Sequence, residues 1–184
     1  EMAMSDMVIT SQLTSILFSI ALVFVILTIA FKSPVAGLLG VIPLLFTIIL
    51  NFMVMGFAGI NLDLITSLIA SVAVGVGIDF TIHFMESYSS LRKKNANVEE
   101  VTLETFAVSG HGIVTNALAV GLGFLVLVLS KFDVLKYIGI LAAVVMFSSS
   151  FLAMTVIPGV LNASDPDFMK SKEERERNIA EEKE

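Results

Sequence analysis

The chain has 184 residues, of which 56% are hydrophobic and only 15% are charged, and its mean hydropathy is +0.92. Soluble globular chains are roughly 45–50% apolar and about 25% charged, so this composition excludes a soluble fold. A formal net charge of −6 excludes the basic surface typical of a nucleic-acid-binding protein, and the lack of cysteine excludes disulfides and thiolate metal sites.

Charged residues avoid five long apolar stretches, which we predict to cross a membrane as helices. A bilayer core of about 30 Å requires about 20 apolar helical residues, because unpaired backbone polar groups are costly in hydrocarbon. The predicted spans are 10–31, 35–56, 64–88, 108–130 and 134–161. Their connections are short, so consecutive helices should be antiparallel neighbours in an all-α, five-helix transmembrane bundle.

Three segments lie outside these spans. Residues 1–9 are expected to be an extracytoplasmic stub that ends a missing external domain. Residues 97–107 predict an interfacial helix, with Asn97 as its N-cap and Glu100 three residues later. Residues 162–184 mix Lys, Arg and Glu with almost no apolar residue, which predicts a frayed or disordered polar tail in the cytoplasm.

The placement of lysine and arginine predicts the orientation of the bundle. Nine of the 11 basic residues fall on the side that holds Lys32, Arg92 and the polar tail, whereas Lys131 and Lys136 fall on the other side. We therefore expect a multi-pass protein of the cytoplasmic (inner or plasma) membrane, with its N-terminus outside and its C-terminus in the cytoplasm. Because the polar stub would then begin outside with no preceding span, we also expect the chain to be a piece of a longer protein.

Ionisable residues interrupt the third predicted span. Asp79 lies about a turn from the middle of that span, and a helical period of about 100° per residue places His83 and Glu86 on the same face. An ionisable group near the bilayer centre costs at least about 2.5–3.5 kcal/mol and usually marks a proton or ion pathway. We predict a proton relay through Asp79 and His83, with structural hydrogen bonding as the alternative for each. Glu86 is expected to reach the cytoplasmic interface.

Small residues recur on two of the predicted spans. In the third span they are Ser67, Ser71, Gly75 and Gly77, and in the fourth Ser109, Gly112, Asn116, Ala119 and Gly123. Small residues allow membrane helices to approach closely, so we expect these two spans to pack along this seam. Thr115 or Asn116 should then lie nearest to Asp79 or His83, and His111 is expected at the level of the lipid headgroups.

A glycine-rich run followed by an acid occupies residues 73–84, which read AVGVGIDFTIHF. This segment resembles the signature of the resistance-nodulation-division (RND) superfamily, most closely that of its MmpL-type hydrophobe exporters. Further similarity follows in the same order along the chain at residues 32–33, 42–43, 62–63, 68–71, 109–110, 115–117, 121–124 and 157–158. Phe80 departs from the pattern, since the family often has Tyr there. The resemblance covers about residues 5–161 and implies one five-helix half of such a transporter, related to the sterol-sensing domain.

The resemblance implies the transmembrane half of an exporter of lipids or other hydrophobic compounds that is driven by the proton-motive force. Asp79 would be the relay carboxylate and His83 its partner, with Gly75, Gly77, Thr115, Asn116 and Glu86 in supporting positions. Protons would be the coupling ion, and no cofactor is expected. The expected partners are membrane lipids, the other pseudo-symmetric half and external domains, with a homo-oligomer as a further option and no nucleic acid.

The main alternative is a sterol-sensing-like module that binds a lipid between its helices and regulates a partner. The titratable Asp79 favours the exporter, because a lipid sensor has less need of such a group. An enzyme is not expected. An intramembrane aspartyl protease requires a second buried carboxylate, a zinc site requires more ligands than His83 and Glu86, and the chain contains no GxxxxGK[ST] loop.

Overall fold

The computed structural model describes residues 2–60, 64–95 and 97–170, without the side chains of residues 2–9, 64, 65, 67–74 and 167. Every element in these ranges is helical, and they contain no strand, which confirms the all-α fold class. The helices are α1 (Met2–Phe31), α2 (Pro34–Ala58), α3 (Leu64–Arg92), α4 (Val98–Thr105), the π-helical turn η1 (Phe106–Gly110), α5 (His111–Leu125), the 3-10 turn η2 (Val126–Leu129), α6 (Asp133–Ser164) and the 3-10 turn η3 (Asp167–Met169).

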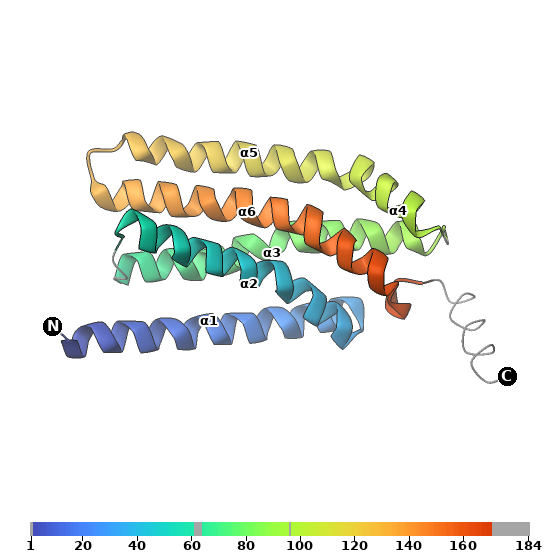
Figure 1. Ribbon diagram of the computed structural model, residues 1–184, viewed down its shortest axis with the longest axis horizontal. Coiled ribbons are helices and arrows are strands. Elements are labelled where there is room, and N and C mark those ends of the chain that lie inside the picture. Colours follow the sequence, from blue (N-terminus) through green and yellow to red (C-terminus); the bar gives the residue numbers. More distant parts are fainter. Residues whose placement is uncertain (1, 61–63, 96, 171–184) are drawn as a thin grey trace.

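The long helices run side by side along the long axis of the molecule (Figure 1). One end gathers the N-terminus of α1, the α2–α3 connection and the turn before α6. The other end gathers the α1–α2 turn, the α3–α4 connection and the C-terminal end of α6, and we call it the α4 end. Consecutive long helices are therefore antiparallel.

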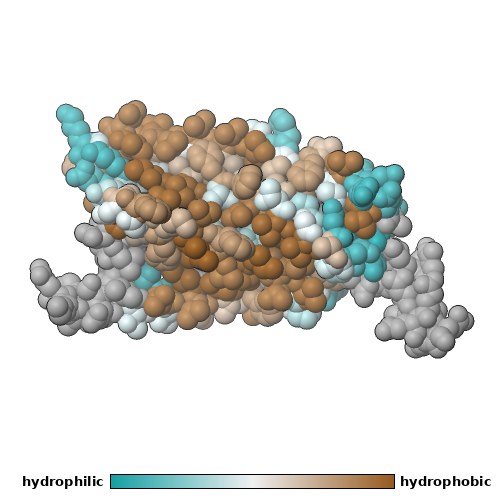
Figure 2. Space-filling model, viewed as in Figure 1, coloured by the Kyte–Doolittle hydropathy of each residue, from teal (hydrophilic) through white to brown (hydrophobic). Residues whose placement is uncertain are grey.

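Four helical segments of the described chain are long and apolar enough to cross a membrane: Thr10–Phe31, Pro34–Ala58, Val98–Leu129 and Asp133–Ser164. The predicted span 64–88 does form helix α3, and most side chains of its first half lie outside the described ones. Its second half carries Asp79, His83, Glu86 and Arg92. Hydrophobic side chains cover the middle of the molecule and hydrophilic ones gather at its two ends (Figure 2), as expected of a multi-pass membrane bundle.

Helix α6 lies at the centre of the bundle, in contact with α2, α3 and α5. Its contact with α5 depends on two glycines. A Cβ atom on Gly139 would lie 2.6 Å from the backbone oxygen of Phe124, and one on Gly121 would lie 2.7 Å from the ring of Phe147. Small residues at these two positions let the helix backbones approach closely.

The predicted packing of the third span on the fourth along the small-residue seam is wrong. Helix α5 packs mainly on α6, and its buried row is Ile113, Ala117 and Gly121. The seam residues Gly112 and Asn116 are exposed on the other side of α5. Small residues at helical spacing occur on both sides of this helix, so spacing alone did not identify the packed side. Ser67 and Ser71 of the same prediction lie outside the described side chains.

The start of α4 follows the prediction more closely. Asn97 is its N-cap, and the Asn97 side-chain oxygen accepts hydrogen bonds from the backbone N–H groups of Glu99 (3.1 Å) and Glu100 (3.4 Å). The Glu100 carboxylate accepts instead from the side chain of Asn95, whose own oxygen accepts from the Asn97 N–H group. In a capping box the side chain of Glu100 would accept a hydrogen bond from the Asn97 N–H group. Here the side chain of Asn95 accepts that hydrogen bond.

The predicted frayed or disordered tail is wrong for residues 162–170. Helix α6 continues to Ser164, Met169 is fully buried, and the ring of Phe168 packs edge-on against Phe31, with 6.4 Å between the ring centres. Phe168 and Met169, two apolar side chains in a mostly polar segment, pack it against the bundle. Residues 171–184 of that prediction, and residue 1 of the predicted stub, lie outside the described residues, while residues 2–9 continue the backbone of α1.

Candidate functional site

Helix α3 places Asp79 and His83 one turn apart. The Nε2 atom of His83 lies 3.4 Å from Oδ1 of Asp79, and the two side chains are 61% and 51% exposed, respectively. Residues four apart on a helix face the same direction, which explains the approach. A carboxyl group and an imidazole at this distance can exchange a proton after a small movement of either side chain.

The two glycines before Asp79 lie on different sides of α3. A Cβ atom on Gly77 would make ordinary contacts with Leu44 and Ser149 at 3.6 Å, so Gly77 faces α2 and α6. Gly75 is exposed and a Cβ atom there would meet nothing within 4 Å. The structure therefore groups Gly75, and not Gly77, with Asp79 and His83.

Asn116 of α5 lines the same cavity as His83. A cavity of about 350 Å³ lies between α3 and the start of α5, and both His83 and Asn116 line it, together with Phe80, Ser109 and Gly112. Asp79 and Thr115 do not line this cavity, although Thr115 is exposed. The structure thus brings together one of the predicted α5 residues, Asn116, and the histidine.

Exposed residues of α3 and α5 together form a surface that we call the open face. It consists of Gly75, Asp79, His83 and Glu86 on α3 and of Gly112, Asn116, Ala119 and Gly123 on α5. Its α5 glycines, like Gly75, have nothing within 4 Å of an added Cβ atom. The sequence predicted that this surface is buried against protein, and no described residue covers it.

Glu86 and His111 lie apart from this pair. Glu86 lines a different cavity at the α4 end of the bundle, together with Lys32, Lys93 and Lys94. His111 is the exposed first residue of α5 and does not line the cavity that His83 shares with Asn116. Within the described residues, no group of three or more His, Asp or Glu side chains is placed to hold a metal ion.

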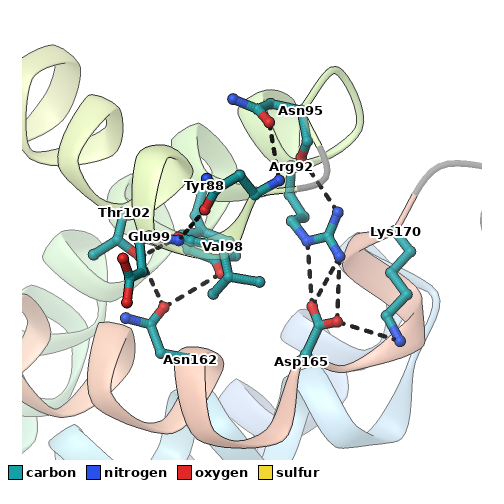
Figure 3. A network of polar contacts seen from close by, with 10 residues as sticks. Tyr88, Arg92, Asn95, Val98, Glu99, Thr102, Asn162, Asp165 and Lys170 are labelled. Atoms are coloured by element: carbon teal, nitrogen blue, oxygen red, sulfur yellow. Dashed lines mark hydrogen bonds and ion pairs between the residues drawn. The ribbon is translucent and has the colours of Figure 1, made fainter.

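A polar network at the α4 end joins α3, α4 and α6, and the sequence did not predict it (Figure 3). Arg92 is only 2% exposed. Its Nε and Nη2 atoms donate to Oδ1 of Asp165 at 3.2 and 3.1 Å, Nη2 also reaches Oδ2 at 3.2 Å, and Nη1 donates to the backbone oxygen of Asn95 at 3.2 Å. Lys170 approaches the other side of the same carboxylate, with Nζ 3.4 Å from Oδ2.

Asn162 extends the network to α4. Its side-chain oxygen accepts hydrogen bonds from Thr102 Oγ1 at 2.7 Å and from Tyr88 Oη at 3.5 Å. Asp165, with φ of 35°, ends α6 in the left-handed conformation, and its N–H group donates to the oxygen of Leu161. The Asp165-Pro166 pair is a helix-end signal that could have marked this position in the sequence.

Together, the apolar helices and the ionisable pair within one of them define a multi-pass membrane protein with a polar site inside its helical bundle. The profile of the MMPL family matches residues 2–178. The chain therefore belongs to the MMPL family and is an RND-type membrane protein.

Relatives of known description share parts of the chain. It is similar to a membrane protein of Methanocaldococcus jannaschii, with 26% identity over 147 residues that cover 80% of this chain and 38% of the relative. It is also similar to mouse protein patched homolog 2 (30% identity, covering 71% of this chain and 11% of the relative) and to a hopanoid transporter of Rhodopseudomonas palustris (28% identity, covering 58% and 12%). The chain thus spans 38% or less of the length of these relatives. No solved structure matches it.

Proposed function

We propose that this chain is a transmembrane half of an exporter of lipids or other hydrophobic compounds that is driven by the proton-motive force. In this proposal Asp79 binds and releases the coupling proton and His83 passes it on. The observation that carries the proposal is the 3.4 Å approach of these two side chains on an exposed face in the middle of an apolar bundle. Membership of the MMPL family and similarity to a protein described as a hopanoid transporter support it.

The energetic logic follows from the cost of charge in a membrane. An ionised Asp79 next to hydrocarbon costs at least about 2.5–3.5 kcal/mol, and this cost falls when the carboxyl group is protonated. Proton entry along the membrane potential supplies about 2.3 kcal/mol per 100 mV, which is of the same size. Protonation of Asp79 can therefore change which arrangement of the helices is more stable.

The open face is the surface through which this half would contact the other, pseudo-symmetric half. Small residues on a membrane helix favour contact with another helix over contact with lipid. Such a contact would shield Asp79 and His83 from hydrocarbon and complete the proton pathway. The concentration of lysine and arginine at the α4 end supports an orientation with this end in the cytoplasm.

The Asp79→Asn variant tests the proposal, because it keeps the shape of the side chain and removes its titration. The full-length parent protein, which would hold both halves, would be purified and reconstituted into liposomes that contain a pH-sensitive dye, and substrate-coupled proton flux would be recorded. We expect at least about a tenfold loss of flux in this variant. Asp133→Asn, which changes an exposed aspartate paired with Lys136 at the far end of the bundle, should stay within about twofold of wild type.

Retention of proton-coupled export by Asp79→Asn would show that the relay assignment is wrong. The same assay addresses the sterol-sensing-like alternative. A regulatory module would bind lipid without any proton flux in the unmodified protein, whereas an exporter shows flux that depends on Asp79.

A further inference from the structure

A second cavity lies at the α4 end, and Glu86 of the open face lines it, whereas Asp79 and His83 do not. Its volume is about 630 Å³, and the α1–α2 turn, the C-terminal end of α3 and η3 enclose it. Lys32, Lys93 and Lys94 contribute three ammonium groups to its lining and Glu86 contributes one carboxylate. The cavity therefore carries an excess of positive charge that no other described group neutralises by an ion pair.

The fold holds the Lys32 backbone in place at the rim of this cavity. Lys32 adopts the left-handed conformation with φ of 53°, which L side chains rarely occupy. The Lys32 N–H group donates to the oxygen of Ile29 at 3.3 Å, and the next N–H group, that of Ser33, donates to the oxygen of Thr28 at 3.1 Å. This tight turn places one lysine from the α1–α2 connection at the same cavity as the two lysines that follow α3.

The opposite part of the lining is apolar. Phe31 and Phe168 line the cavity and pack against each other edge to face. Ala30 of α1 also lines the cavity, and one turn earlier on the same side of this helix Ile26 is 49% exposed and begins an apolar outer surface. The cavity thus joins a basic compartment to an apolar surface that faces lipid, at the end of the bundle where hydrophobic side chains give way to hydrophilic ones (Figure 2).

We propose that this cavity binds the headgroup of an anionic phospholipid. The phosphate would lie among Lys32, Lys93 and Lys94, and the acyl chains would follow the apolar side of α1 towards the middle of the bundle. Basic pockets between transmembrane helices at the membrane surface recognise anionic headgroups in this way. Glu86 would accept a hydrogen bond from a headgroup hydroxyl, which favours a glycerol headgroup over a bare phosphate. Neither residue of the proposed relay pair, Asp79 or His83, lines this site.

Native mass spectrometry of the purified, detergent-solubilised protein tests the proposal, with phosphatidylglycerol and phosphatidylcholine as probes. We expect one phosphatidylglycerol molecule to remain bound under conditions that remove phosphatidylcholine. The double variant Lys93→Gln/Lys94→Gln should bind phosphatidylglycerol at least about tenfold more weakly. The matched control Lys131→Gln/Lys136→Gln removes the same charge at the opposite end and should stay within about twofold of the unmodified protein.

Equal weakening in both double variants would overturn the proposal, because the attraction would then depend on net charge and not on the cavity. Inorganic phosphate and glycerol 3-phosphate serve as competitors to separate a lipid from a soluble anion. We expect neither to displace phosphatidylglycerol at a comparable concentration, since neither contacts the apolar side of α1. Displacement by either at such a concentration would show a soluble-anion site and overturn the lipid assignment. Unchanged thermal unfolding of the variants would confirm that they are folded.

Discussion

At the scale of single residues, Arg92 shows how this bundle accommodates a charge away from water. Its side chain is 1% exposed, and its guanidinium group donates to both oxygens of Asp165 and to the backbone of Asn95. A buried cation is stable only when such partners replace the water that it has lost. The Asp165 carboxylate, with Lys170 on its other side, is therefore a structural requirement at the α4 end.

The Asp165→Asn variant should destabilise the protein. Asn tolerates the left-handed backbone of position 165, so the end of α6 is retained and only the charge is lost. Removal of one partner from a buried ion pair costs about 3–5 kcal/mol, and because Asp165 is partly exposed we expect about 2–3 kcal/mol. Thermal or denaturant unfolding in detergent measures the change.

Asp133→Asn is the control for this prediction. Asp133 lies 2.8 Å from Lys136, closer than Asp165 lies to Arg92, but its side chain is 73% exposed. An exposed pair contributes about 0–1 kcal/mol, so this variant should unfold almost as the unmodified protein does. Equal effects of the two substitutions would show that burial of Arg92 does not determine the energy of its ion pair.

The two kinds of polar residue differ in how far the sequence could predict them. Asp79 and His83 stand out because they interrupt an apolar stretch, and a helical period of about 3.6 residues is enough to place them together. Arg92 lies at the end of its helix, where a basic residue is ordinary, and its partner is 73 residues away. No local pattern connects such a pair, and only the folded bundle shows it.

At the scale of elements, the sequence predicted most helices but not which helix faces pack. Residues 97–107 and 108–130 were predicted as two helices, whereas the helical segment is continuous from Val98 to Leu129 and contains a π-helical turn at Phe106–Gly110. The sequence there has no proline to end a helix, so a local change of winding replaces a break. The choice between the two small-residue sides of α5 depends on what α6 presents to it, namely Gly139 and Phe147.

The contact between α5 and α6 predicts the effect of Gly139→Ala. The new methyl group would lie 2.6 Å from the Phe124 oxygen and 3.0 Å from Leu127 Cβ, and a helix backbone cannot move aside without separating the two helices. Overpacking costs about 1–3 kcal/mol, which exceeds the gain of about 1 kcal/mol in helix propensity. We expect a lower midpoint of thermal unfolding.

Gly159→Ala on the same helix is the matched control. A Cβ atom at Gly159 meets nothing within 4 Å, so only the gain in helix propensity of about 1 kcal/mol applies, and the midpoint should stay the same or rise. If Gly139→Ala raised the midpoint as well, the close approach of α5 to α6 would be contradicted.

At the scale of the whole molecule, two kinds of exposed surface have different consequences in a membrane. Helix α1 exposes large apolar side chains, including Phe18 at 70% and Leu17 at 67%, which suit contact with lipid. The open face exposes two acids, a histidine and three glycines, which suit contact with another protein surface. The apolar composition predicted a membrane protein, but it could not distinguish these two surfaces, because the distinction depends on which sides of α3 and α5 the bundle leaves uncovered.

Photo-crosslinking from the two surfaces tests this difference in the membrane-embedded protein. We expect a benzophenone amino acid at Ala119, on the open face, to form adducts with polypeptide, and the same group at Phe18 to form adducts with lipid. Peptide mass spectrometry then identifies the partner of Ala119. Peptides from outside residues 1–184 would indicate the other transmembrane half, and peptides from this chain joined between two copies would indicate a homo-oligomer. Lipid adducts at both positions would show that the open face lies against lipid. Asp79 would then have to be neutral or reached by water, because an ionised carboxylate in contact with hydrocarbon costs at least about 2.5–3.5 kcal/mol.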